Sequence, residues 1–293
     1  MLLTQVAVVS ETNQITPSQL SRVAAALQKQ ATRDFAPLWN VSATVDAFDR
    51  LEDVPVGYWP VIVRDDINEP GAAGIHLDEH GQPFALVQYS DSWSLTASHE
   101  ALEMLADPGG SRLMAGQSPK SDQGVVEFLV EVADPPEDPQ FGYTVNGLLV
   151  SDFITPHFYD PVQADGVRYS FGGNIEKPRS IREGGYISFL DRTTNHWWQQ
   201  VWFGTSQPTF RDLGRMTDRA GSLRSAIDAK TETAQRIAQA GPQSLKFADA
   251  RTLTAQIKKT TASRAQGWRD QIEALMAGKI IEGSWEGGEV NNG

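Results

Sequence analysis

The stretch SWSLTASHEALEMLAD, residues 92–107, is the most informative part of this sequence. Residues that cap helices precede it, and Asp107-Pro108-Gly109-Gly110 behind it ends helices, so it predicts a helix of about four turns. His99 and Glu103 lie one turn apart in this helix, and Asp107 lies one turn further on, so all three point toward one side. A histidine and a carboxylate with this spacing can bind one metal ion.

The chain before this helix predicts a small α/β unit. Residues 4–9 are typical of a buried strand, and Thr16-Pro17 begins a helix as its N-cap and first-turn proline. That helix has one apolar stripe, which supports the assignment. Further strands are expected at residues 41–48, 60–63, 74–77 and 84–89, the last two joined as a hairpin.

The motif His99-Glu100-x-x-Glu103 resembles the His-Glu-x-x-His helix of the zincin metallopeptidases, with Glu103 in place of the second histidine. Zincins place this helix after a small α/β sheet, and residues 4–107 follow that order. The resemblance implies that His99 and Glu103 bind a divalent metal, with zinc as the expected ion, and that Glu100 is the general base acting on a metal-bound water. It also implies a peptide or protein substrate, which we expect along residues 84–89.

The third metal ligand must come from a later part of the chain. Glu131 lies in an otherwise apolar predicted strand, Asp134 ends that strand before a proline, and His157 lies among aromatic residues, so we rank the candidates in that order. Tyr143 or Tyr159 could donate a hydrogen bond to a developing oxyanion. His76 and His80 flank a turn and are expected on the surface.

The rest of the chain divides into a β-rich middle and a helical end. Strands are expected at residues 125–132, in an Asn146-Gly147 hairpin spanning residues 143–150, and at residues 185–190 and 196–203. Apolar residues then recur at helical spacing from Leu213 to Ile237 and from Leu253 to Leu275, which predicts an antiparallel helical hairpin.

The predicted fold class is therefore α+β, with a zincin-like α/β N-terminal part that contains a mixed sheet and the active-site helix. The expected boundaries are residues 1–205 for the body with its β-rich extension, residues 206–281 for the helical hairpin, and residues 282–293 for a flexible tail.

Composition limits the possible functions. The chain has 293 residues, no cysteine and a net charge of −12, which excludes thiolate metal sites and argues against nucleic acid as a partner. Residues 1–205 carry 12 Lys and Arg against 27 Asp and Glu, whereas residues 206–281 carry 13 against 7. We therefore expect the basic segment to dock on the acidic body or on another acidic partner.

Other motifs and segments are missing from the sequence. No apolar run approaches the ~20 residues of a membrane-spanning helix, and the first residues do not resemble a signal peptide, so we expect a soluble, cytoplasmic protein with no membrane partner. Phosphate-binding glycine motifs and the serine-hydrolase Gly-x-Ser-x-Gly are absent as well.

Two functions remain after these exclusions. The first is a metal-dependent hydrolase, most simply a peptidase, that uses Glu100 as its base. The second is a catalytically inactive zincin-like binding or structural protein, which would form a homo-oligomer or bind a protein partner through residues 206–281.

Overall fold

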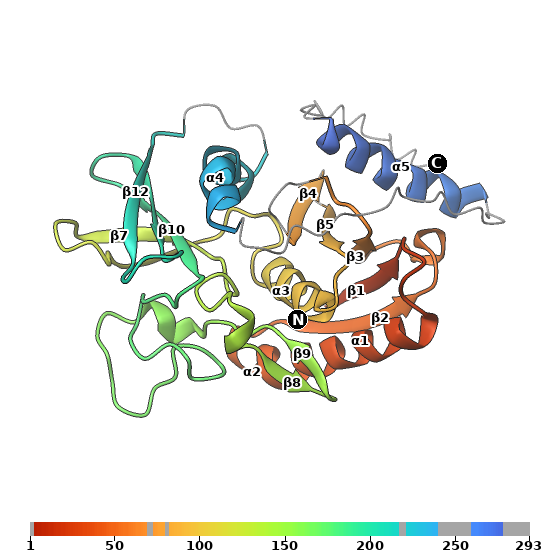
Figure 1. Ribbon diagram of the computed structural model, residues 1–293, viewed down its shortest axis with the longest axis horizontal. Coiled ribbons are helices and arrows are strands. Elements are labelled where there is room, and N and C mark those ends of the chain that lie inside the picture. Colours follow the sequence, from red (N-terminus) through yellow and green to blue (C-terminus); the bar gives the residue numbers. More distant parts are fainter. Residues whose placement is uncertain (1–2, 69–72, 80–81, 217–220, 240–258, 278–293) are drawn as a thin grey trace, which may run out of the picture.

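The protein combines two five-stranded sheets, one short hairpin and a few helices, as Figure 1 shows for this computed structural model. The structure describes residues 3–68, 73–79, 82–216, 221–239 and 259–277. The predicted tail from residue 282 lies outside these ranges, as does the start of the second predicted C-terminal helix. The fold class is α+β, as the sequence predicts.

The first sheet is formed by the N-terminal third of the chain. Its strand order is β2-β1-β3-β5-β4, and only β4 runs antiparallel to its neighbour. The strands are β1 (Leu3–Ser10), β2 (Ser42–Phe48), β3 (Tyr58–Arg64), β4 (Gly74–Glu79) and β5 (Gln82–Gln88). The prediction that a substrate lies along residues 84–89 requires an open strand edge, but β5 is paired on both sides; the edge strands among the described residues are β2 and β4.

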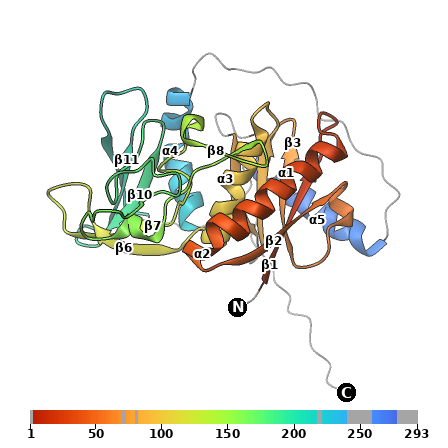
Figure 2. The ribbon, with the colours of Figure 1, turned by 90° about the horizontal axis from the view of Figure 1, so that it is seen from below.

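The two faces of this sheet carry different helices. Alternate side chains of β1 point to opposite faces, so Val6 and Val8 pack with α1 (Pro17–Lys29) and α3 (Trp93–Ala106), while Ala7 and Val9 join a second apolar cluster. Trp268 and Ile272 of α5 (Lys259–Met276) complete that second cluster. Figure 2 shows α1 and α5 on opposite sides of the sheet.

Local sequence signals explain the first helix and its continuation. Thr16 caps α1, and its side chain and that of Gln19 form the reciprocal hydrogen bonds of a capping box. The helix continues as a π-helical segment, η1 (Gln30–Phe35), and ends in α2 (Ala36–Trp39), where Asn40 takes a left-handed conformation.

The second sheet is antiparallel, with strand order β12-β11-β10-β7-β6. Its strands are β6 (Leu113–Gln117), β7 (Val125–Leu129), β10 (Tyr186–Asp191), β11 (His196–Val201) and β12 (Thr209–Gly214). The predicted hairpin at residues 143–150 is confirmed as β8 (Tyr143–Val145) and β9 (Leu148–Val150), with positive φ at Asn146 and Gly147. Three short 3-10 turns, η2 (Leu51–Asp53), η3 (Pro139–Phe141) and η4 (Pro156–Tyr159), complete the elements.

The prediction of an antiparallel helical hairpin at residues 206–281 is wrong for the described residues, because the segment starts with a strand and its two helices pack on different sheets. Residues 209–214 form β12, which pairs with β11, so the helical spacing that starts at Leu213 crosses a strand end. The helix α4 (Leu223–Gln239) packs Leu223 and Ile227 against the second sheet, whereas α5 packs on the first. Figure 1 shows the two helices apart, because each finds its apolar partner on the body.

None of the helices that the structure describes combines the length and apolarity needed to cross a membrane.

Candidate metal centre

The helix α3 brings three polar side chains into the protein interior. Glu103 is fully buried, Glu100 is almost fully buried, and the His99 side chain is 12% exposed. Most other residues of α3 are buried too, because one side of the helix packs on the first sheet while the opposite side faces the segment after β7. A helix enclosed on both sides can hold buried ionisable groups only when they find partners.

Asp134 reaches α3 from the end of the second sheet. The chain leaves β7 at Leu129, earlier than predicted, and runs buried to Asp134. The Ala133 N–H donates to Glu103 Oε1 at 3.0 Å, and the Tyr186 N–H donates to the carbonyl of Asp134 at 3.2 Å. A Cβ on Gly185 would collide with the Asp134 and Pro135 carbonyls, so this close approach requires glycine.

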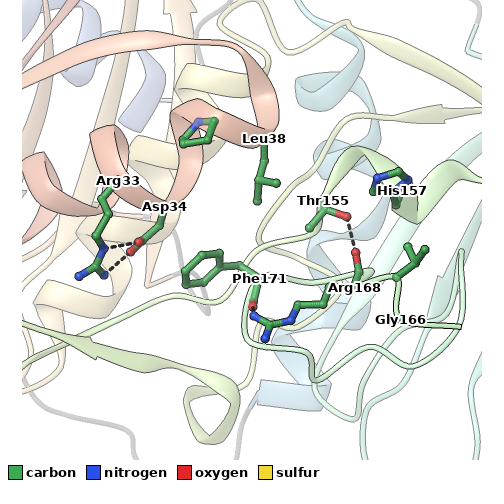
Figure 3. Close-up of a pocket in the computed structure, with 10 residues that line it drawn as sticks. Arg33, Asp34, Leu38, Thr155, His157, Gly166, Arg168 and Phe171 are labelled. Carbon is green, nitrogen blue, oxygen red and sulfur yellow. Dashed lines mark hydrogen bonds and ion pairs between the residues drawn. The ribbon is translucent and has the colours of Figure 1, made fainter.

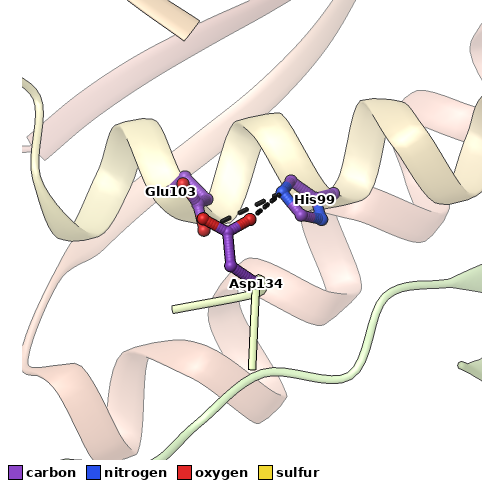
Figure 4. A group of neighbouring side chains, drawn as sticks. All are labelled: His99, Glu103 and Asp134. Carbon is purple, nitrogen blue, oxygen red and sulfur yellow. Dashed lines mark ion pairs between the residues drawn. The ribbon is translucent and has the colours of Figure 1, made fainter. Parts of the chain in front are cut away.

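His99, Glu103 and Asp134 form one cluster, which Figure 4 shows between α3 and the Asp134 segment. His99 Nε2 lies 3.0 Å from Asp134 Oδ1 and 3.8 Å from Glu103 Oε1. Two ligands on one tetrahedral zinc ion are about 3.4 Å apart, given bonds of about 2.1 Å. The ligand atoms of the three groups all lie within 4.8 Å of one another, so the cluster is a candidate site for one divalent ion, and one nitrogen with two oxygens is a donor set of the kind that zinc or manganese accepts.

The charges in the cluster stabilise one another. Burial by itself lowers the pKa of His99, but the hydrogen bond to Asp134 and the charges of Glu100 and Glu103 raise it to about 10. Burial likewise opposes ionisation of Asp134, and Arg224 and His99 outweigh it, so the pKa of Asp134 is lowered. Burial raises the pKa of Glu103, which Arg224 offsets only in part. A bound cation must therefore displace the proton of His99.

Arg224 is a member of the cluster that the sequence did not predict. Its side chain extends from α4, is 8% exposed, and contacts Glu103 Oε2 through Nη1. Its Nη2 lies 3.5 Å from Asp134 Oδ2. The expectation that a basic segment docks on the acidic body is met here by one buried guanidinium.

His76 is a second unpredicted member, and the expectation that it lies on the surface is wrong. It is 97% buried on the edge strand β4, with Nδ1 3.7 Å from both Glu100 Oε2 and Glu103 Oε2. Neither ring nitrogen has a hydrogen-bond partner among the described residues, and nor does Glu100 Oε2. Gly74 permits this approach, because a Cβ there would lie 2.6 Å from Glu100 Oε1.

Further ionisable groups border the cluster. Glu131 is fully buried and accepts a 3.3 Å hydrogen bond from the Ser188 N–H, and burial raises its pKa. Burial, followed by the charge of Asp134, raises the pKa of Glu137 to about 8. Tyr159 is buried without a hydrogen-bond partner for its hydroxyl among the described residues, and burial raises its pKa. Glu131 is not among the three groups that can share an ion, although the sequence analysis ranks it as the first candidate for the third metal ligand.

Two predicted site residues lie elsewhere. The Tyr143 hydroxyl donates to Asp34 Oδ2 at 2.9 Å and accepts a hydrogen bond from Gln30, so it is already bound outside the cluster. The His157 side chain is 59% exposed and pairs with Asp160 at 2.8 Å, so it cannot supply the third ligand. It lines a pocket of about 410 Å³ that also includes Arg33, Arg168 and Phe171 (Figure 3).

Asp107 serves the helix end rather than the cluster. Its side chain accepts a 2.8 Å hydrogen bond from the Arg112 N–H, as its position before Pro108 suggests. Of the unpredicted members, His76 could have been found from the alternation of β4, which places it on the same face as Gly74. Arg224 has no comparable local signal, because it is 121 residues away from Glu103 in the sequence.

Comparisons with protein-family models, curated proteins and solved structures give no match for this chain.

Proposed function

We propose that this chain is a zincin-like, metal-dependent hydrolase that cleaves peptides. The observation that carries the proposal is the convergence of His99, Glu103 and Asp134, whose ligand atoms all lie within 4.8 Å of one another. The mixed sheet that ends in the antiparallel edge strand β4, followed by α3, supports the zincin-like assignment. Asp134 takes the third ligand position in this proposal.

The chain's own residues have distinct roles around this centre. His99, Glu103 and Asp134 would hold a divalent ion, which would polarise the substrate carbonyl and acidify water. Glu100 follows His99 directly on α3, and its Oε2 has no hydrogen-bond partner among the described residues, so it is available to take a proton. His76 Nδ1 lies 3.7 Å from Glu100 Oε2, and neither ring nitrogen has a hydrogen-bond partner within the described part of the chain, so His76 would donate to an oxyanion, the role expected of Tyr143 or Tyr159.

The substrate would bind along β4. This strand is one of the two edges of the sheet among the described residues and the one that carries His76, and an extended peptide can add to such an edge through backbone hydrogen bonds. His76 lies on β4 and its side chain faces α3, so a peptide paired with β4 would pass close to Glu100.

The first experiment measures metal content and cleavage together. Purified protein is loaded with Zn²⁺, dialysed, and analysed for bound metal, and cleavage is followed on a mixture of synthetic peptides. One zinc per chain is expected, with loss of binding in His99→Ala and Asp134→Ala. Glu100→Gln should keep the metal and lose cleavage by about 10²- to 10⁴-fold, because only the proton acceptor is removed.

Glu127→Gln is the matched control. Glu127 is a partly exposed glutamate on β7 that pairs with Arg192 at 2.5 Å, away from the cluster, so this variant should retain both metal and cleavage. Wild-type protein that binds no zinc would contradict the proposal. Cleavage that survives Glu100→Gln would contradict the assigned base.

A second candidate function is a zincin-like fold without catalysis, and Arg224 favours it. The guanidinium supplies a positive charge to Glu103 and Asp134, so the cluster is stable without an ion. Assembly through the C-terminal helices gains no support, because Leu223, Ile227, Trp268 and Ile272 are buried within this chain. The same metal analysis separates the candidates, since this second one expects metal-free protein.

A further inference from the structure

Arg224 contacts the two candidate carboxylate ligands on oxygens that do not face His99. Its guanidinium reaches Glu103 Oε2 and Asp134 Oδ2, and on the other side its Nε lies 3.9 Å from Asp228 Oδ2 of α4 itself. His99 Nε2 lies nearest to the other oxygen of each carboxylate, Glu103 Oε1 and Asp134 Oδ1. A cation held by His99 and these proximal oxygens can therefore be present together with the guanidinium on the distal ones.

The backbone of α4 fixes Arg224 at this place. The Arg224 N–H donates to the Gly110 carbonyl at 2.9 Å, and the Leu223 N–H donates to Ser111 Oγ at 3.1 Å. Both acceptors belong to the turn that directly follows α3. Ile227, one turn further along α4, is fully buried against the second sheet. The helix that carries Arg224 is thus joined to the helix that carries Glu103.

The charge of the three candidate ligands indicates what the Arg224 guanidinium would contribute to the cation site. Two carboxylates and one imidazole give a bound divalent ion no net positive charge, whereas two imidazoles and one carboxylate leave one positive charge. An ion with less positive charge around it acidifies water less. A guanidinium on the distal oxygens withdraws electron density from both carboxylates and adds one positive charge, and it also fixes their orientation.

We propose that Arg224 is a positioning residue of the cation site, which orients Glu103 and Asp134 and offsets the charge that Glu103 adds in place of a histidine. This inference rests on the proposed function, since it requires a divalent ion at His99, Glu103 and Asp134. Arg224 itself touches neither substrate nor ion; it acts through the two carboxylates.

Cobalt substitution tests the inference without a substrate. Co²⁺ is loaded into wild-type protein and into Arg224→Met, Arg224→Lys and Arg269→Met, and the visible absorption is titrated with pH. The midpoint of the spectral change reports the ionisation of water on the ion. In Arg224→Met we expect this midpoint to rise by about one pH unit, because one nearby positive charge is lost. Arg224→Lys keeps the charge but cannot contact both carboxylates equally, so a smaller rise is expected.

Arg269→Met is the matched control, because Arg269 also joins a C-terminal helix to two glutamates, but on the far face of the first sheet. Its midpoint should equal that of the wild type. An unchanged or lower midpoint in Arg224→Met overturns the inference while the proposed function stands. Should Arg224→Met not fold, the same criterion applies to Arg224→Lys. Wild-type protein that takes up no Co²⁺ or Zn²⁺ overturns both the proposed function and the inference.

Discussion

Each of the two C-terminal helices attaches to the body through one arginine that contacts two carboxylates, but the surroundings of the two arginines differ. Arg224 of α4 is 8% exposed and contacts Glu103 and Asp134, which are almost completely buried. Arg269 of α5 is 26% exposed and contacts Glu11 and Glu52, whose side chains are 10% and 6% exposed. The difference lies in the guanidinium: the one that water still reaches serves mainly attachment, whereas the enclosed one also helps to keep its carboxylates ionised.

The largest expected difference concerns stability of the metal-free protein. Arg224→Met leaves two buried carboxylates without their guanidinium, so we expect a loss of about 3–5 kcal/mol in the free energy of unfolding. Arg269→Met should cost less, about 1 kcal/mol, because the Arg269 guanidinium is 26% exposed and Arg64 remains 3.7 Å from Glu11. Urea unfolding with a chelator present measures both. Equal losses in the two variants would remove the distinction between the helices.

A double-mutant cycle sharpens this distinction. Glu103→Gln keeps an oxygen that can accept from the Ala133 N–H but removes the charge, so it should relieve much of the damage caused by Arg224→Met. We expect a coupling energy of about 2 kcal/mol for this pair, and below about 1 kcal/mol for Arg269→Met with Glu52→Gln. Additive losses at Arg224 and Glu103 would show that the buried contact carries little energy.

The dependence of stability on pH should arise from ionisable groups buried beside the His99 cluster, which Arg224 contacts, rather than near Arg269. Burial raises the folded-state pKa of Glu137 to about 8, above its ordinary value near 4.5. A folded pKa above the unfolded one means that the folded state binds the proton more tightly, so stability falls as pH rises from about 4.5 to 8. In the metal-free protein, Glu137→Gln should reduce this fall, by on the order of 1 kcal/mol.

The measurement is urea unfolding of metal-free protein at several pH values across this interval. Glu127→Gln, the surface variant used above, should behave like the wild type. A pH dependence that is the same in Glu137→Gln as in the wild type would show that Glu137 does not bind its proton more tightly in the folded protein.

The smallest expected difference between α4 and α5 is in how strongly salt changes the contribution of each arginine to stability. The Arg269 guanidinium is 26% exposed, so added salt can screen its charge, and raising ionic strength should reduce the small contribution of Arg269 to stability. The Arg224 contacts are buried and should be nearly insensitive to salt. The stability difference between each variant and the wild type, measured at low and at high salt, tests this; a strongly salt-dependent Arg224 would mean that solvent reaches the cluster.

Local signals in the sequence account for most of the first sheet and its helices. Thr16-Pro17 begins α1, and the stretch around His99 that ends before Pro108 forms α3. Asn146-Gly147 likewise forms the separate β8–β9 hairpin, because each of these features depends on contacts within a few residues. The same logic failed after residue 206. Helical spacing of apolar residues was traced through Leu213, although that residue pairs as part of β12.

The candidate site was predictable only as far as α3 extends. Helical geometry is enough to predict that His99, Glu100 and Glu103 lie together. It does not predict that Asp134, rather than Glu131 or His157, joins His99 and Glu103. Early termination of β7 at Leu129 changes which side chains reach α3, and strand ends depend on pairing with distant residues. The surface position predicted for His76 is also wrong, because that prediction follows the neighbouring turn and not the alternation of β4, which puts His76 on the same face as Gly74.

The sequence by itself determined the helix with its histidine and two glutamates, the mixed α+β composition and the charge contrast between the body and the C-terminal segment. Tertiary structure alone decided that Asp134, His76 and Arg224 meet that helix and that α4 and α5 dock on different sheets. The physical reason is that helix spacing, caps and turns are local properties. Burial and charge pairing between residues about 120 positions apart exist only once the chain has folded.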